Sequence, residues 1–168
     1  MTVRVLQLAV FILLVSCQPT PQNSREVLFT PIVLPVTPTV SPPTLSPKSV
    51  ALGKTVYATH CAACHGANLE GEEDWKVQNE DGSFRSPPHD ASGHTWHHGD
   101  PTLWASILQG GARFEGENIG GTSPMPAFAE TLTDEEITAV INYIKSTWPA
   151  DIRILQWEAT LREQQLEN

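Results

Sequence analysis

Two thiols and an imidazole lie within five residues, in the run Cys61-Ala62-Ala63-Cys64-His65. This C-x-x-C-H spacing is typical of covalent haem attachment, because the two cysteines can reach the two vinyl groups while the adjacent histidine binds the iron. Half of a zinc site would need a second ligand pair of similar spacing, and no cysteine follows Cys64. A redox-active dithiol would need a βαβ setting, which the sequence lacks. We therefore predict one covalent haem c, with Cys61 and Cys64 forming thioethers and His65 binding the iron.

A methionine further along the chain is the expected sixth iron ligand. Met125 lies sixty residues after His65, and the other methionine, Met1, belongs to a predicted signal peptide. Pro124 and Pro126 flank Met125, remove backbone donors and fix φ, as suits a loop laid against a haem face. A thioether opposite histidine raises the reduction potential and closes the iron to small molecules. The alternative is that Met125 fills a gap in the core.

Four histidines are grouped within ten residues, just past the middle of the chain. They are His89, His94, His97 and His98. Neutral imidazoles are good ligands for copper or zinc, so this segment is a candidate second metal site, although the sequence gives it no geometry. One of these histidines could also replace Met125 on the iron and give a bis-histidine haem. The sequence leaves both alternatives open.

Apolar periodicity predicts helices over about 49–63, 101–109, 134–148 and 150–166. Gly53 lies inside the first helix, and because glycine costs a helix about 1 kcal/mol relative to alanine, it indicates close approach of another helix. Asp100 as N-cap and Pro101 as first residue open the second helix. Thr133 and Glu136 form a capping box for the third. The fourth either covers the domain surface or serves as a docking helix.

With the haem motif near its start, Met125 late and a closing helix, the segment 49–148 resembles a class I cytochrome c domain. The resemblance implies an all-α fold, a small domain of about four to five helices wrapped around one haem. It also implies that Val140 and Tyr143 cross the first helix at Gly53. Residues 149–168 are a helical extension beyond the usual end of such a domain.

Three further residues have candidate roles beside the haem. In the family a proline carbonyl accepts the Nδ1–H of the proximal histidine and orients its ring, and Pro87 and Pro88 both match that description. Arg113 follows a pair of glycines and could pair with a haem propionate, or it could be a solvent-exposed arginine. The sequence does not choose between these possibilities.

The N-terminal part of the chain has the pattern of an export signal followed by an anchor and a linker. Residues 1–16 combine an early arginine, a short apolar run and a small-residue end, as in a secretory signal peptide. The run resembles the lipobox of bacterial lipoproteins, which implies that Cys17 becomes a lipid-modified N-terminus. Residues 17–48 are rich in proline and threonine and are expected to form an extended tether. We expect an extracytoplasmic, membrane-anchored lipoprotein, on the periplasmic side or at the cell surface.

The overall charge restricts the class of partner. The 168 residues carry a formal net charge of −9, so there is no basic face for nucleic acid. An acidic stretch between residues 70 and 81 could instead steer a redox protein, or a respiratory or photosynthetic membrane complex, that has a basic docking face. We predict a one-electron carrier rather than an enzyme. The alternative is a haem c subunit of an enzyme, or a small-gas sensor, with a labile distal ligand.

Overall fold

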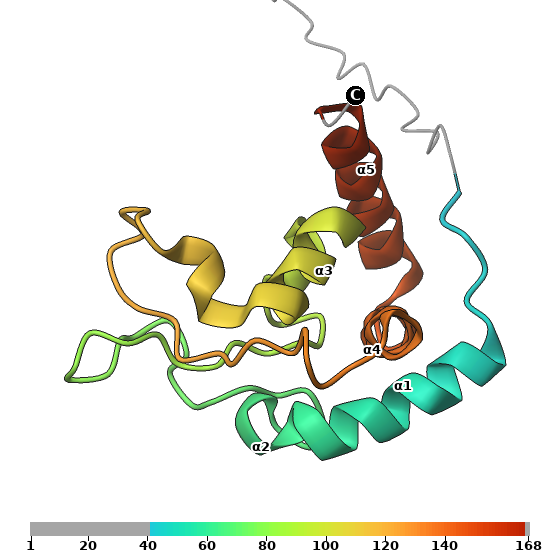
Figure 1. Cartoon of the computed structure of the whole chain (residues 1–168). Coiled ribbons are helices and arrows are strands. Elements are labelled where there is room, and N and C mark those ends of the chain that lie inside the picture. Colours follow the sequence, from blue (N-terminus) through green and yellow to red (C-terminus); the bar gives the residue numbers. More distant parts are fainter. Residues whose placement is uncertain (1–40, 167–168) are drawn as a thin grey trace, which may run out of the picture. The chain divides into compact units, whose positions relative to one another are not determined.

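The computed structural model describes residues 41–166, so the predicted signal peptide, Cys17 and most of the tether lie outside the described residues. The helices in order are α1 (Pro47–His60), α2 (Ala62–His65), α3 (Asp100–Gln109), α4 (Asp134–Ser146) and α5 (Ala150–Leu166) (Figure 1). Two short 3-10 helices, η1 (Thr95–His97) and η2 (Gly110–Phe114), flank α3. The described residues form no strand, since their β pairing is a single isolated bridge. The predicted all-α fold class is confirmed.

Helices α1 and α4 cross at a point where one of them has no side chain. A Cβ atom on Gly53 would lie 1.9 Å from the carbonyl oxygen of Ala139 and 2.8 Å from the Cβ of Tyr143. Ala139 and Val140 are fully buried at this crossing. The predicted close approach at Gly53 is confirmed, because only glycine lets the two backbones come so near.

The core is built mainly from α1, α4 and the segment that follows α2. Its buried apolar members are Val56, Tyr57, Leu69, Leu132, Ile137, Val140, Ile141, Ile144 and Trp148. The predicted capping box at the start of α4 is present: Glu136 N donates to Thr133 Oγ1 at 3.3 Å, and Thr133 N donates to Glu136 Oε2 at 2.9 Å. The cap fixes where α4 begins, and the apolar stripe of α4 then faces the core.

The structure corrects two of the predicted helix starts and ends. The first predicted helix is interrupted at Cys61, so the haem motif belongs partly to α1 and partly to the short α2. Helix α3 includes Asp100, and its N-cap is Gly99 instead of Asp100. None of the helices between residues 41 and 166 is long and apolar enough to cross a membrane.

Helix α5 has the predicted bounds, and the side chains that it buries are not its large apolar ones. Gln156 and Thr160 are fully buried, whereas Leu155 is 46% exposed. Ile152 does pack against the core. Two of the three buried residues of α5 are therefore polar, and their hydrogen bonds contribute to how the helix docks.

Candidate haem site

The haem motif lies at the junction of α1 and α2, which follow each other directly in the chain (Figure 1). Cys61 caps α1 by donating its N–H to Tyr57 O at 2.9 Å, and His65 N donates in turn to Cys61 O at 2.9 Å. The two cysteines in the described part of the chain are unpaired; Cys61 is half-buried and Cys64 is exposed. One turn of helix thus carries two free thiols, with the imidazole directly after them.

The ring of His65 is fixed by a main-chain acceptor from a distant loop. Its Nδ1 lies 2.8 Å from the carbonyl oxygen of Pro87. Because a carbonyl can only accept, Nδ1 carries the proton and Nε2 keeps a free lone pair. The carbonyl of Pro88 instead accepts a hydrogen bond of 3.3 Å from Thr95 Oγ1. Of the two candidate prolines, Pro87 therefore occupies the position that orients the His65 ring.

The charge state of His65 also suits a ligand of the haem iron. Burial is the main influence and lowers the pKa of His65, whereas the hydrogen bond to Pro87 and the nearby Glu72 act in the opposite direction. The side chain is only 8% exposed. A neutral imidazole with a free Nε2 is the form that binds iron.

The hydroxyl of Tyr57 also holds the haem motif, by hydrogen bonds to its main chain. Its hydroxyl lies 3.2 Å from the carbonyl oxygen of His65 and 3.1 Å from that of Gly66, and it donates to this pair of acceptors. Tyr57 is 1% exposed, and burial raises its pKa, so the hydroxyl keeps its proton. No local pattern pointed to this bond, because its acceptors are eight and nine residues away.

The Met125 loop is attached to the C-terminal end of α3. Gly111 N donates to Met125 O at 2.8 Å, and Phe128 N donates to Ile107 O at 3.1 Å. The ring of Phe128 contacts that of His60, at the end of α1, with centroids 6.1 Å apart. Met125 itself is half-buried. The loop that carries the predicted sixth ligand is therefore connected both to α3 and to the helix that leads into the haem motif.

The donor groups present match those that haem c requires. The motif offers two unpaired thiols, a neutral imidazole with one free nitrogen, and a methionine on a separate loop. Burial and the neighbouring Cys64 raise the pKa of the Cys61 thiol to about 11. Cys61 is therefore an intact S–H group, which is what adds across a vinyl double bond to form a thioether.

Comparison with known families agrees with this geometry. The family model described as Cytochrome c matches residues 50–148, more than half of the chain. The chain belongs to the cytochrome c family. Membership implies covalently bound haem c and exchange of electrons with redox partners. No curated protein and no solved structure matches the chain in the corresponding comparisons.

The histidine segment of this cytochrome c does not form an evident second metal site. His89 stacks on His65, with ring centroids 3.9 Å apart, whereas His94 stacks on Trp75 at 5.1 Å. The His94 and His98 rings are 5.6 Å apart, edge to face. Within residues 41–166, no three side chains from histidine, cysteine, aspartate and glutamate are grouped so that they could hold a metal ion. The part of the chain that the structure describes thus gives a second metal no support.

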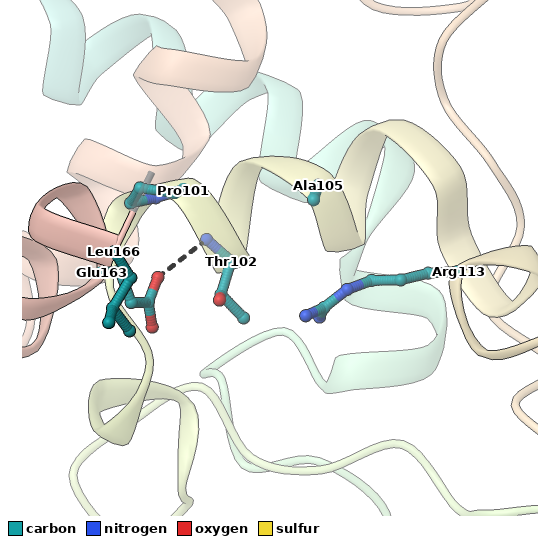
Figure 2. A pocket seen from close by; sticks show the side chains of 6 residues that line it. All are labelled: Pro101, Thr102, Ala105, Arg113, Glu163 and Leu166. Carbon is teal, nitrogen blue, oxygen red and sulfur yellow. Dashed lines mark hydrogen bonds between the residues drawn. The ribbon is translucent and has the colours of Figure 1, made fainter. Parts of the chain in front are cut away.

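Arg113 lies beside Ser106 of α3. Its Nη1 donates to Ser106 Oγ at 2.7 Å, and its guanidinium carbon lies 5.2 Å from the centre of the Phe114 ring. Figure 2 shows the Arg113 side chain on one side of a hollow, with Glu163 of α5 on the other. Its suggested pairing with a haem propionate stays a prediction.

Several of the acidic residues after the haem motif have structural partners. Glu70 accepts from Asn68 N at 2.7 Å, and Asp81 accepts from Ser83 N at 2.9 Å. Glu72 accepts from Ser86 N, one residue before Pro87. The acidic stretch therefore shapes the loop that holds His65, and its carboxylates are also exposed.

Proposed function

We propose that this cytochrome c is a membrane-tethered carrier of single electrons between extracytoplasmic redox partners. The family supports the general role of a haem c electron-transfer protein. The observation that carries the proposal is the 2.8 Å bond from His65 Nδ1 to Pro87 O, directly beside the two free thiols. This bond supports His65 as a fixed, neutral iron ligand, which is what a carrier requires.

In this proposal each site residue has one task. Cys61 and Cys64 would hold the cofactor covalently, and the free Nε2 of His65 would bind its iron. Met125 would supply a second iron ligand through its sulfur, and an iron with all its positions filled would exclude small molecules. When bound, haem c supplies reversible one-electron chemistry at its iron. The chain contributes rigid attachment, and the hydrogen bonds of His65 and Tyr57 keep the site from reorganising with each electron.

The exposed Cys64 indicates where electrons would enter and leave. A thioether at this position would place one edge of the haem near the surface. Exposed carboxylates follow shortly after it, including Glu73, Asp74 and Glu80. Together with the formal net charge of −9, they favour a partner with a basic docking face.

The tether would keep the domain within reach of a membrane partner. We infer that residues 1–16 are removed, that Cys17 carries the lipid, and that residues 17–48 link it to a cytochrome c domain at 49–148 with an extension at 149–168. If extended at ~3.1 Å per residue, residues 18–48 would span at most about 95 Å. The domain could therefore reach a neighbouring complex while it stays anchored.

Substitution of the proposed sixth ligand tests the carrier function. A redox titration of the purified holoprotein gives the midpoint potential of its haem. The Met125→Leu variant is compared with the parent. Leucine keeps the apolar volume but has no sulfur, so we expect the one-electron midpoint potential to fall because the thioether raises it. An unchanged potential in the variant would show that Met125 does not bind the iron. A Thr122→Ala variant in the same loop is the control.

A further inference from the structure

The start of α3 is capped by side chains from a different helix. Gly99, the N-cap residue, has no side chain that could accept a hydrogen bond, and Pro101 has no N–H to donate. Leu103 N begins the helical pattern by donating to Gly99 O at 3.0 Å. The remaining free amides at this end, those of Gly99, Asp100 and Thr102, need acceptors from elsewhere.

Helix α5 supplies those acceptors. The carboxylate of Glu163 accepts from Gly99 N at 2.7 Å through Oε1 and from Thr102 N at 3.1 Å through Oε2. Figure 2 shows the second of these bonds. Thr160 Oγ1, one turn earlier on α5, accepts from Asp100 N at 3.0 Å. Every free N–H of the first turn of α3 is thus satisfied by α5, and the negative charge of Glu163 lies where the helix dipole favours it.

The approach of α5 to α3 is close and specific. A Cβ atom on Gly99 would lie 2.7 Å from the Cα of Thr160, so a larger residue there would push α5 away. The carboxylate of Asp100 adds a second connection, because it accepts from Lys145 Nζ of α4 at 2.8 Å and from Gln156 Nε2 of α5 at 2.8 Å. Lys145 and Gln156 are both buried. The start of α3 is therefore held by two helices.

The other end of α3 holds the loop of the proposed sixth ligand. The carbonyls of Ile107 and Leu108 accept from Phe128 N at 3.1 Å and Ala129 N at 3.2 Å, and Gly111 N donates to Met125 O at 2.8 Å. Helix α3 is ten residues long, about 15 Å. One short helix thus connects the cap from α5 to the Met125 loop.

We propose that Glu163, with Thr160, is a positioning residue for Met125: the C-terminal helix α5 fixes α3, and α3 presents the Met125 loop to the iron. The inference rests on the proposed role of Met125 as sixth ligand. Helix α5 lies beyond residues 50–148, the part matched by the family model, so this support is a feature of the present chain and not of the matched domain.

The test measures carbon monoxide uptake by the reduced holoprotein, which can proceed only when the sixth ligand has left the iron. Glu163→Gln removes the charge and one acceptor, and Thr160→Val removes the hydroxyl at nearly constant volume. Loss of a helix cap shifts a local equilibrium by about tenfold, so we expect uptake to become about tenfold faster in each variant. The rates are compared well below the unfolding temperature of each protein.

Two matched controls separate positioning from general stability. Thr160→Ser keeps the acceptor and should leave uptake at the parent rate. Glu158→Gln removes the same charge from another position of α5, where the side chain lines a groove together with Trp96, and should also have no effect. If Glu163→Gln does not yield holoprotein, the Thr160→Val and Thr160→Ser pair decides the question.

The outcomes distinguish this inference from the proposed function. If the parent is closed to carbon monoxide and the Glu163 and Thr160→Val variants lose thermal stability with no faster uptake, α5 is only structural and the inference is wrong. If the parent itself takes up carbon monoxide rapidly, the proposed closed iron is wrong, and the inference falls with it. Faster uptake confined to Glu163→Gln and Thr160→Val supports both the positioning role of α5 and the proposed closed iron.

Discussion

His65 is held through its ring and through its main chain. The Pro87 carbonyl binds Nδ1 at 2.8 Å, and the Tyr57 hydroxyl lies 3.2 Å from the His65 carbonyl oxygen. Each bond fixes a different degree of freedom: the first sets the ring orientation and the tautomer, and the second sets the end of α2. Together they leave His65 little room to move, as its proposed role as an iron ligand requires.

Substitution of Tyr57 by phenylalanine should measure the second of these bonds. Tyr57→Phe removes one of the two donors to each carbonyl, because Gly71 N also donates to His65 O at 2.8 Å and Leu69 N to Gly66 O at 3.2 Å. We therefore expect the free energy of unfolding of the holoprotein to fall by about 0.5–1.5 kcal/mol, the usual contribution of a hydrogen bond. Chemical denaturation monitored by circular dichroism gives the value. Tyr143→Phe, whose ring contacts that of Tyr57, is the control and should have a smaller effect. An equal loss of unfolding free energy in both variants would show that the hydrogen bonds of the Tyr57 hydroxyl do not stabilise the haem motif.

At the scale of elements, the crossing of α1 and α4 depends on one missing side chain. The Gly53→Ala substitution should favour an isolated helix by about 1 kcal/mol, yet its Cβ would lie 1.9 Å from the Ala139 carbonyl oxygen. The steric clash outweighs the gain in helix propensity, because backbone atoms cannot move aside without separating the helices. We therefore expect a destabilisation of more than about 3 kcal/mol, or no folded holoprotein.

The matched variant for this crossing is Ala58→Gly, at an exposed position of the same helix. It should lower the free energy of unfolding by only about 1 kcal/mol, the difference in helix propensity between alanine and glycine. The measurement is the denaturant midpoint of each holoprotein. A Gly53→Ala protein as stable as the parent would show that the helices do not approach as closely as described.

The capping box of α4 should contribute to the pH dependence of stability. Hydrogen bonds from Thr133 lower the pKa of Glu136 below its ordinary value of 4.5. A carboxylate with a depressed folded-state pKa stabilises the fold above its unfolded-state pKa, and this contribution is lost as the pH falls through the folded-state value. The stability difference between the parent and Glu136→Gln should therefore be largest near neutral pH and shrink below about pH 4.

A charge-matched control tests whether the capping bond is responsible. Glu135→Gln removes a carboxylate from the same turn but leaves the hydrogen bonds between Thr133 and Glu136 in place. Unfolding is followed by denaturant titration between pH 7 and pH 3. The same pH dependence in both variants would mean that general charge at the helix start, and not the capping bond, determines the effect.

Some features of the fold and the site could be predicted from the sequence and others could not, for physical reasons. The haem motif, Gly53 and the α4 cap have signals within a few residues, so local chemistry predicts them. The docking of α5 has no such signal, because Glu163 and its partner Thr102 are 61 residues apart and two of the three buried residues of α5 are polar. The choice of Pro87 over Pro88 likewise depends on how a loop folds back 22 residues after His65.

At the scale of the whole molecule, the proposed anchor gives a direct prediction about location. Cys17 lies outside the described residues, and the tether around it is inferred from composition. Several acyl chains on one cysteine hold a protein at a membrane without a spanning helix. We expect Cys17→Ala to move nearly all haem-stained protein from the membrane to the soluble fraction after cell fractionation. Persistent membrane attachment of the variant would contradict the lipoprotein assignment.

The central claim is that the iron of this cytochrome c is closed by His65 and Met125. The most direct test is the visible absorption spectrum of the purified, reduced, full-length holoprotein before and after addition of carbon monoxide. The account predicts a six-coordinate spectrum that shows no rapid change when carbon monoxide is added, because uptake has to wait until Met125 leaves the iron. Rapid formation of a carbon monoxide adduct would contradict it, because an open or labile sixth position belongs to an enzyme subunit or a gas sensor.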